Sequence, residues 1–171
     1  MKQLILGGAR SGKSALAERL ASQTQMPVTY IATATADDEE MRQRITHHQQ
    51  QRPVAWQTVE SPYHLTKALD HHAKPNNCIL VDCLTLWLSN LLCAEHDTLA
   101  ARETFIKTLI DLPGELIMVS NEVGLGVVPM GKLSRRFVDE SGHLHQSLAQ
   151  HCDRVIFTAA GLPLVMKGAA L

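Results

Sequence analysis

The sequence predicts one α/β domain over residues 1–171, with a mostly parallel sheet and helices on both faces of that sheet. Three observations predict this fold class. Short apolar runs alternate with segments typical of helices, a glycine-rich segment separates the first run from the first helix, and 171 residues suit one domain with a full core. Ligands of such sheets bind beyond the carboxyl ends of the strands.

The glycine-rich segment carries the strongest functional signal. Residues 7–14 (GGARSGKS) fit the phosphate-binding loop, or P-loop, pattern G-x-x-x-x-G-K-[ST]. The apolar run 4–6 precedes this loop and the helix-forming run 15–21 follows it, which is the order strand, turn, helix that the motif needs. The alternative is a chance glycine-rich turn before a surface helix.

Backbone N–H groups of such a loop surround a polyphosphate, and the helix N-terminus adds its positive dipole end. We expect Lys13 to reach the β- and γ-phosphates of a nucleoside triphosphate. The whole loop is expected to bind the nucleotide, through Gly7, Gly8, Ala9, Arg10, Ser11, Gly12, Lys13 and Ser14.

A carboxylate is expected beside this loop. Residues 78–82 (CILVD) form an apolar run that closes on Asp82, as a buried parallel strand with an acid at its carboxyl end would. In P-loop enzymes such a carboxylate lies near the loop's hydroxyl. Ser14 and Asp82 are therefore the expected Mg²⁺ ligands.

The remaining elements follow in order along the chain. Strands are expected at 28–33, 54–59, 78–82, 115–120 and 154–159, and helices at 36–51, 62–72, 84–93, 98–112 and 132–151, with a short tail after 161–163. The helix at 36–51 has a thin apolar face of Met41, Ile45 and His48, so it should lie on the surface. The strand ends would bring Gly7, Thr33, Glu60, Asp82 and Asn121 to one edge of the sheet.

Composition excludes several classes of protein. Lys+Arg 16 against Asp+Glu 17 gives no basic excess, so we expect no nucleic-acid partner. No apolar run is long enough to span a bilayer, and no charged-then-apolar leader opens the chain, which favours the cytoplasm. The four cysteines form no C-x-x-C and no zinc spacing, so reduced thiols in or near the core are expected.

The loop alone does not separate a switch GTPase, a motor ATPase and a small-molecule kinase. A signalling GTPase needs an N-K-x-D guanine-binding motif after a late strand, but residues 121–124 read NEVG. Small size, absence of repeats and balanced charge disfavour nucleic-acid motors. A kinase-like transferase remains.

The order of several motifs resembles one enzyme family. The motifs are GGARSGKS at 7–14, YIAT at 30–33, RITHH at 44–48, Arg52-Pro53 followed by Trp56, NEVGLGVVP at 121–129, and Arg136-Phe137 followed by Asp139. Together they resemble the bifunctional adenosylcobinamide kinase / adenosylcobinamide-phosphate guanylyltransferases of cobalamin biosynthesis. The resemblance implies phosphorylation of adenosylcobinamide by ATP or GTP, followed by transfer of GMP from GTP to that phosphate. It also implies homo-oligomers, usually trimers.

In this family a histidine carries GMP during the second reaction, and the resemblance places that residue at His47. A neutral imidazole nitrogen is a competent nucleophile near neutral pH, and covalent transfer divides one displacement into two. Adjacent helix residues point about 100° apart, so only one of His47 and His48 can face the phosphate. His48 shares the apolar stripe of the predicted helix, which leaves His47 for the nucleotide.

The resemblance implies further nucleotide contacts, with Lys13 serving both half-reactions. They are Ala32, Thr33, Ala34, His48, Gln49, Gln50 and Gln51, with Asp82 on the Mg²⁺ side. Glu60 either faces the ribose or base or is a solvated strand end. Arg10 either stabilises transition-state charge or occupies a variable position of the loop.

One segment departs from the family pattern, because His145 stands where the family usually shows Asn before Gln. His143 and His145 face different ways on a helix, so we interpret them as solvated or subunit-contact residues rather than metal ligands. Two other functions stay open from the residues. One is a single-activity small-metabolite kinase with an idle His47, and the other is a GTP-binding regulatory module without transfer chemistry.

Overall fold

The computed structural model of the chain describes residues 1–35, 39, 42, 43, 46 and 52–171. Within these residues the strands are β1 (Lys2–Gly7), β2 (Val28–Ala32), β3 (Gln57–Glu60), β4 (Cys78–Asp82), β5 (Glu115–Asn121), β6 (Arg154–Ala159) and β7 (Leu162–Lys167). The helices are α1 (Lys13–Gln23), α3 (Leu65–His72), α4 (Leu84–Cys93), α5 (Thr98–Asp111) and α6 (Lys132–His151). No helix of this described part is both long and apolar enough to cross a membrane.

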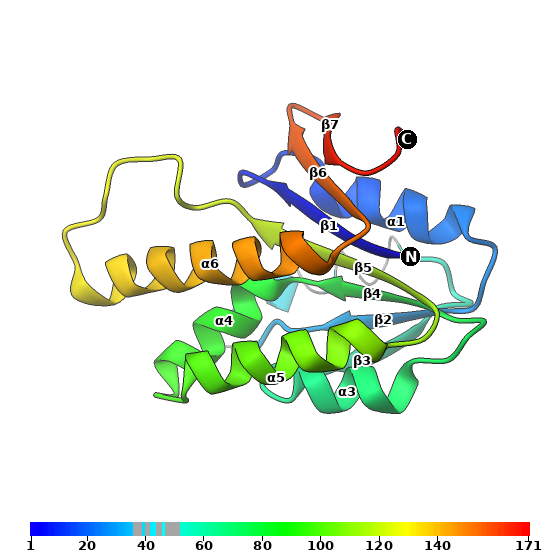
Figure 1. Cartoon of the computed structure of the whole chain (residues 1–171), viewed down its shortest axis with the longest axis horizontal. Coiled ribbons are helices and arrows are strands. Elements are labelled where there is room, and N and C mark those ends of the chain that lie inside the picture. Colours follow the sequence, from blue (N-terminus) through cyan, green and yellow to red (C-terminus); the bar gives the residue numbers. More distant parts are fainter. Residues whose placement is uncertain (36–38, 40–41, 44–45, 47–51) are drawn as a thin grey trace.

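The described strands form one sheet in the order β3-β2-β4-β5-β1-β6-β7. Every neighbouring pair is parallel except β6 and β7, which are antiparallel. The carboxyl ends of the parallel strands therefore meet at one edge of the sheet, the left-hand edge in Figure 1. The loop between β1 and α1 leaves the sheet from this edge.

Helices cover both faces of the sheet, and each face has its own apolar core (Figure 1). On one face Leu16 and Leu20 of α1 pack with Leu80 of β4. On the other face α3, α4, α5 and α6 contribute side chains that pack with Val81, among them Phe105 and Leu148. Alternate residues of a strand point to opposite faces, so adjacent Leu80 and Val81 belong to different cores. The predicted α/β class with a mostly parallel sheet is confirmed.

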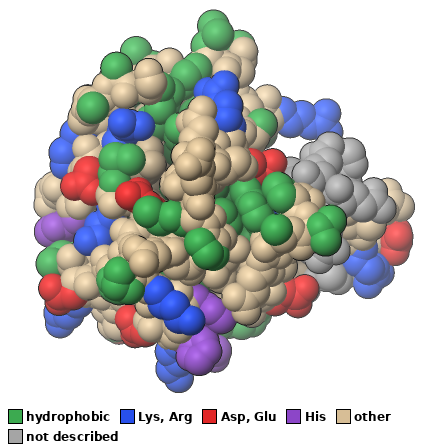
Figure 2. Space-filling view, turned by 90° about the vertical axis from the view of Figure 1, so that its right-hand side faces the viewer, with side chains coloured by type: hydrophobic (Ala, Val, Ile, Leu, Met, Phe, Trp, Pro, Cys, Tyr) green, Lys and Arg blue, Asp and Glu red, His purple; other side chains and the backbone are tan. Residues whose placement is uncertain are grey.

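The face at the amino ends of the strands, seen in Figure 2, mixes acidic and basic side chains with apolar ones between them. No single sign of charge gathers over the part of this face that is drawn in colour. This distribution agrees with the nearly equal totals of basic and acidic residues in the sequence.

Most predicted elements are confirmed to within a few residues, and α6 has the predicted bounds. Two predicted elements begin later than expected. The strand expected over 54–59 begins only at Gln57, because the backbone N–H of Trp56 donates to the carbonyl of Pro53 in a turn. The helix expected from Pro62 begins at Leu65. The helix expected over 36–51 falls mostly outside the described residues.

The expected tail is instead the strand β7. Ala160 and Gly161 both have positive φ, 50° and 79°, which is the conformation of a two-residue hairpin turn with Ala159 paired to Leu162. Pro163 is tolerated because β7 lies at the edge of the sheet, where a missing N–H costs no ladder hydrogen bond. Lys167 at the end of β7 donates to the carbonyls of Ala149 and Gln150.

Gly114, which precedes β5, gives a direct test of the fold. Its φ is +79°, and a Cβ added there would lie 2.3 Å from the Lys74 carbonyl oxygen and 2.6 Å from that of Asn77. Both contacts are to backbone, which cannot rotate away. We expect Gly114→Ala to lower the free energy of unfolding by roughly 1–3 kcal/mol, measured by chemical denaturation.

The matched control is Gly142→Ala in α6, where an added Cβ meets nothing within 4 Å. Removing a helical glycine should raise stability by about 0.5–1 kcal/mol. Equal effects of the two substitutions would contradict the described turn before β5.

Candidate phosphate-binding site

The loop of residues 7–14 connects β1 to α1 and is held in a tight path. Gly7 has φ +153°, and a Cβ there would lie 2.2 Å from the Thr158 carbonyl oxygen and 2.7 Å from Ser11 Oγ. Only glycine therefore fits at the start of the loop. Ser11 N–H donates to the Gly8 carbonyl (3.3 Å), and Gly161 N–H donates to the Ser11 carbonyl (2.9 Å). The turn before β7 thus restrains the backbone of the loop.

The ammonium group of Lys13 lies inside this loop. Its Nζ donates to the Gly8 carbonyl oxygen (2.6 Å) and to Ser11 Oγ (3.4 Å). Only 7% of the residue is exposed. Burial lowers the pKa of Lys13, and the nearby Asp82 carboxylate opposes that shift. The structure therefore places a buried positive charge, with polar neighbours, at the point where the loop motif requires one.

Asp82 ends β4 on the same face of the sheet as α1. Its position in the strand alternates with Val81, whose side chain belongs to the opposite core. Burial raises the pKa of Tyr30, and the charge of the Asp82 carboxylate, to which the Tyr30 hydroxyl donates a hydrogen bond, raises it further. The guanidinium of Arg52 lies 3.4 Å from the centroid of the Tyr30 ring. Tyr30 thus adds a hydroxyl beside Asp82, and Arg52 adds a cation over the Tyr30 ring.

Sequence reasoning did not assign a role to Tyr30 or Arg52 in this site. A tyrosine in the middle of a strand reads as a core residue, and Arg52 carries no local signal beyond its proline neighbour. Two buried nitrogens of Arg52, Nε and Nη1, have no hydrogen-bond partner. An unsatisfied buried donor is costly, so this guanidinium is suited to bind an oxyanion.

Thr33 connects the ends of β2 and β4. Its hydroxyl donates to the Cys83 carbonyl (2.6 Å) and accepts from the Cys83 N–H (2.9 Å), while its own N–H donates to the Asp82 carbonyl (3.3 Å). The Thr33 carbonyl accepts from the amide of Asn90 (2.9 Å). Thr33 is fully buried. These bonds fix the backbone that carries Asp82, and Ala34 follows directly.

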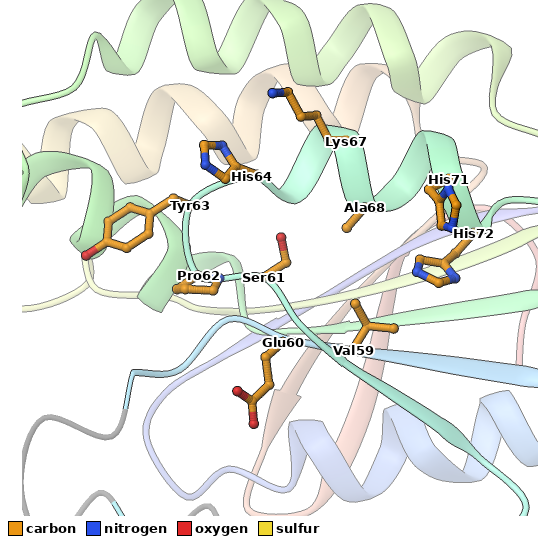
Figure 3. A pocket seen from close by; sticks show the side chains of 10 residues that line it. All are labelled: Val59, Glu60, Ser61, Pro62, Tyr63, His64, Lys67, Ala68, His71 and His72. Carbon is orange, nitrogen blue, oxygen red and sulfur yellow. The ribbon is translucent and has the colours of Figure 1, made fainter.

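The strand register places the other predicted residues along the same edge. Glu60, Ala32 and Asp82 are aligned across β3, β2 and β4. Asn121 and Thr158 are aligned with Gly7 across β5, β1 and β6. Figure 3 shows the Glu60 carboxylate pointing to the α1 side of the sheet, whereas Val59 points toward α3. Predicted residues His47, His48, Gln49, Gln50 and Gln51 lie outside the described part of the chain.

A separate groove of about 480 Å³ lies between β3 and α3 (Figure 3). Glu60, Ser61, His64, Lys67, His71 and His72 are among the residues that line it. The groove lies on the α3 side of the sheet, whereas the Glu60 carboxylate points to the α1 side (Figure 3). We assign the groove no role in phosphate binding.

Of the two alternatives for His143 and His145, solvated or subunit-contact residues, the solvated alternative is wrong for His145, whereas His143 is exposed. His145 is only 6% exposed, since α6 presents it to the end of β5, and its Nε2 lies 2.7 Å from Ser120 Oγ. Four free cysteines are present; Cys78 and Cys152 are buried as expected, but Cys93 is exposed.

Known proteins are similar in sequence to this chain along nearly its whole length. The family model described as cobinamide kinase / cobinamide phosphate guanyltransferase matches residues 3–166. The bifunctional adenosylcobalamin biosynthesis protein CobP of Pseudomonas aeruginosa is 56% identical over 173 residues, covering all of both chains. The CobU proteins of Escherichia coli and Salmonella typhimurium are 36% and 38% identical, each over 98% of this chain and 100% of that protein.

Two solved structures share the fold. A protein of Pyrococcus horikoshii OT3 has a TM-score of 0.57 at 10% identity, over 99% of this chain and 87% of that one. The RadB recombinase has a TM-score of 0.54 at 13% identity, over 91% of this chain and 73% of its own. At such low identities the likeness concerns the fold alone. With the family match over residues 3–166 and the loop that encloses Lys13, the chain belongs to the cobinamide kinase / cobinamide phosphate guanyltransferase family.

Proposed function

We propose that residues 1–171 act as one domain with two successive activities. The first transfers a phosphoryl group from ATP or GTP to adenosylcobinamide. The second transfers GMP from GTP to adenosylcobinamide phosphate, which releases pyrophosphate and gives adenosylcobinamide-GDP. The observation that carries the proposal is the buried Lys13 ammonium inside the glycine loop, in a chain 56% identical to a bifunctional relative.

We expect the phosphates to bind to the loop in the conformation that it already has. When a triphosphate enters, its oxygens take the place of the Gly8 carbonyl and Ser11 hydroxyl as acceptors for Lys13. Backbone N–H groups of residues 7–14 and the N-terminus of α1 stabilise the remaining negative charge. Arg52, which has two unpartnered nitrogens and lies over the ring of Tyr30, is a further cation for the phosphates. Charge of this kind matters most in a loose transition state.

The residues present suit Mg²⁺. Ser14 and Asp82 would hold the ion through a hydroxyl and a carboxylate, the hard oxygen donors that Mg²⁺ prefers, and the phosphates complete its shell. Burial lowers the pKa of Lys13 and the Asp82 carboxylate opposes this shift, so the carboxylate lies within electrostatic reach of the loop. When bound, the ion neutralises charge on the transferred group.

Guanylyl transfer proceeds through His47 in this proposal. The lone pair of its imidazole forms a P–N bond to the α-phosphorus of GTP, the bond to the bridging oxygen breaks, and pyrophosphate leaves with that electron pair. A phosphate oxygen of adenosylcobinamide phosphate then attacks the same phosphorus and releases the imidazole. Ala32, Thr33, Ala34, Glu60 and His48–Gln51 remain proposed nucleotide contacts. The Glu60 carboxylate at the sheet edge suits a ribose or base.

We also propose a cytoplasmic homotrimer. The segment between β5 and α6 exposes apolar side chains almost completely, with Val127 97% and Met130 95% exposed. Leu125, Val128 and Leu133 extend this patch. Water-exposed apolar side chains in such a continuous run are typical of a surface that another chain covers.

Replacing Lys13 tests its role in phosphate binding. Lys13→Met keeps the length of the side chain but removes the charge, so both activities should fall at least about 100-fold. The variant should still fold, because burial disfavours the charged form of Lys13 in the folded protein. Initial rates of phosphorylation and guanylyl transfer measure the effect, and thermal melting checks the fold.

Arg19→Met is the matched control, since Arg19 is exposed on the same helix. It should leave both rates unchanged. Full activity of Lys13→Met would refute the assigned role of the loop.

Replacing His47 separates the two activities. His47→Asn removes the nucleophile, so guanylyl transfer should vanish while phosphorylation of adenosylcobinamide survives. Incubation with α-³²P-GTP and Mg²⁺ should give an acid-labile, base-stable label on the wild-type protein and none on the variant.

His71→Asn, at an exposed position of α3, serves as the control and should still be labelled. No label on the wild-type protein at saturating GTP would contradict the covalent route and favour a single-activity kinase. If the wild-type protein neither became labelled nor phosphorylated adenosylcobinamide, a GTP-binding module without transfer chemistry would be favoured.

A further inference from the structure

A buried row of polar side chains lies behind the glycine loop, at the carboxyl end of β5. It consists of Thr85 of α4, Ser120 of β5 and His145 of α6. Thr85 Oγ1 is 3.2 Å from Ser120 Oγ, and Ser120 Oγ is 2.7 Å from His145 Nε2. All three residues are at most 8% exposed. None of them belongs to the proposed phosphate site.

The two ends of the row define the direction of its hydrogen bonds. At one end the backbone N–H of Asn121 donates to Thr85 Oγ1 (2.6 Å), so this oxygen is an acceptor there. At the other end His145 Nδ1 faces Glu122 Oε2 at 3.6 Å. A nitrogen lone pair pointing at a carboxylate would be repelled, so Nδ1 carries the proton. Nε2 then accepts from Ser120, and Ser120 in turn accepts from Thr85.

With Nε2 as acceptor, the imidazole is assigned the neutral tautomer that is protonated at Nδ1. Burial lowers the pKa of His145, and Glu122 opposes this shift. In the same arrangement every hydroxyl of the row has a defined donor and acceptor partner. His145 Nδ1 has no partner within hydrogen-bond distance and meets only the Glu122 carboxylate, at 3.6 Å. The hydroxyl hydrogen bonds restrain the row.

Glu122 connects the row of polar side chains to the glycine loop. Its backbone N–H donates to the carbonyl of Gly7, the first residue of the glycine loop (2.9 Å). Its carboxylate Oε1 accepts from Gly124 N–H (2.6 Å), while Oε2 faces His145. Asn121, aligned with Gly7 across the sheet, is held by Thr85. A shift of Glu122 would therefore displace the start of the loop.

We propose that His145 is a positioning residue: its Nδ1–H holds the Glu122 carboxylate, and Glu122 holds Gly7 and the segment that follows β5 in the geometry needed for phosphoryl transfer. His145 touches neither nucleotide nor acceptor in this role. The kinetic part of the test rests on the proposed function, whereas the tautomer does not.

Two substitutions separate positioning from packing. His145→Asn keeps an amide N–H in the place of Nδ1, so the contact to Glu122 survives. His145→Leu fills the space but removes the donor. We expect the Leu variant to lose about 10–100-fold in kcat of phosphorylation, with the KM for nucleotide within about twofold. The Asn variant should stay within about threefold of wild type.

The control is His143→Leu, an exposed position on the same helix, which should leave kcat unchanged. Wild-type kcat in His145→Leu would overturn the proposal. An Asn variant as impaired as the Leu variant would overturn it too, because packing alone would then explain the loss.

Nitrogen-15 NMR of the wild-type protein tests the same idea without any folding risk. The His145 signals, identified by their absence in His145→Asn, should show a neutral ring protonated at Nδ1 at pH 7. Protonation at Nε2 would overturn the proposal even if the Leu variant failed to fold. A wild-type protein with this tautomer but neither transfer activity would refute the proposed function alone.

Discussion

The site depends on the charge of Lys13, which is buried away from water. Lys13 is 7% exposed, and burial lowers its pKa, yet its ammonium still donates to the Gly8 carbonyl at 2.6 Å. Burying a cation costs free energy unless acceptors surround it. The loop supplies those acceptors, and Asp82 supplies an opposite charge nearby. The fold around the loop provides the rigidity that keeps this arrangement in place.

That rigidity comes from elements far apart in the sequence. Gly7 has no room for a side chain because the Thr158 carbonyl of β6 lies against it. The turn at Gly161 bonds the Ser11 carbonyl, and Glu122 bonds the Gly7 carbonyl. Three segments, from β6, the β6–β7 turn and the end of β5, thus support eight residues of loop. A parallel sheet makes this possible because its strands deliver their carboxyl ends to one edge.

Local patterns made much of the fold predictable. The strand, glycine turn and helix of residues 2–23 are adjacent in sequence, and α6 shows its apolar spacing over twenty residues. The hairpin strand β7 was missed because Gly161 and Pro163 read as chain breakers, whereas Gly161 forms the turn and Pro163 lies on an edge strand. Its pairing with β6 depends on the tertiary structure, which local sequence patterns do not show.

Much of the candidate site could be predicted as well, but neighbours across the sheet could not. Lys13 and Asp82 follow from motif and strand pattern. Tyr30 lies near Asp82 only because β2 pairs with β4, and Arg52 lies over the Tyr30 ring; strand order cannot be deduced from one sequence. His145 looked solvated because its burial depends on how α6 packs against the end of β5. Residues that act through such packing need coordinates.

A crystal structure with Mg²⁺ and a non-hydrolysable GTP analogue tests the central claim most directly. The account predicts that the β-phosphate lies within the loop of residues 7–14, with Lys13 Nζ moved from the Gly8 carbonyl to phosphate oxygens. A nucleotide whose phosphates lie elsewhere, for example in the groove between β3 and α3, with Lys13 still bonded to Gly8, would contradict it.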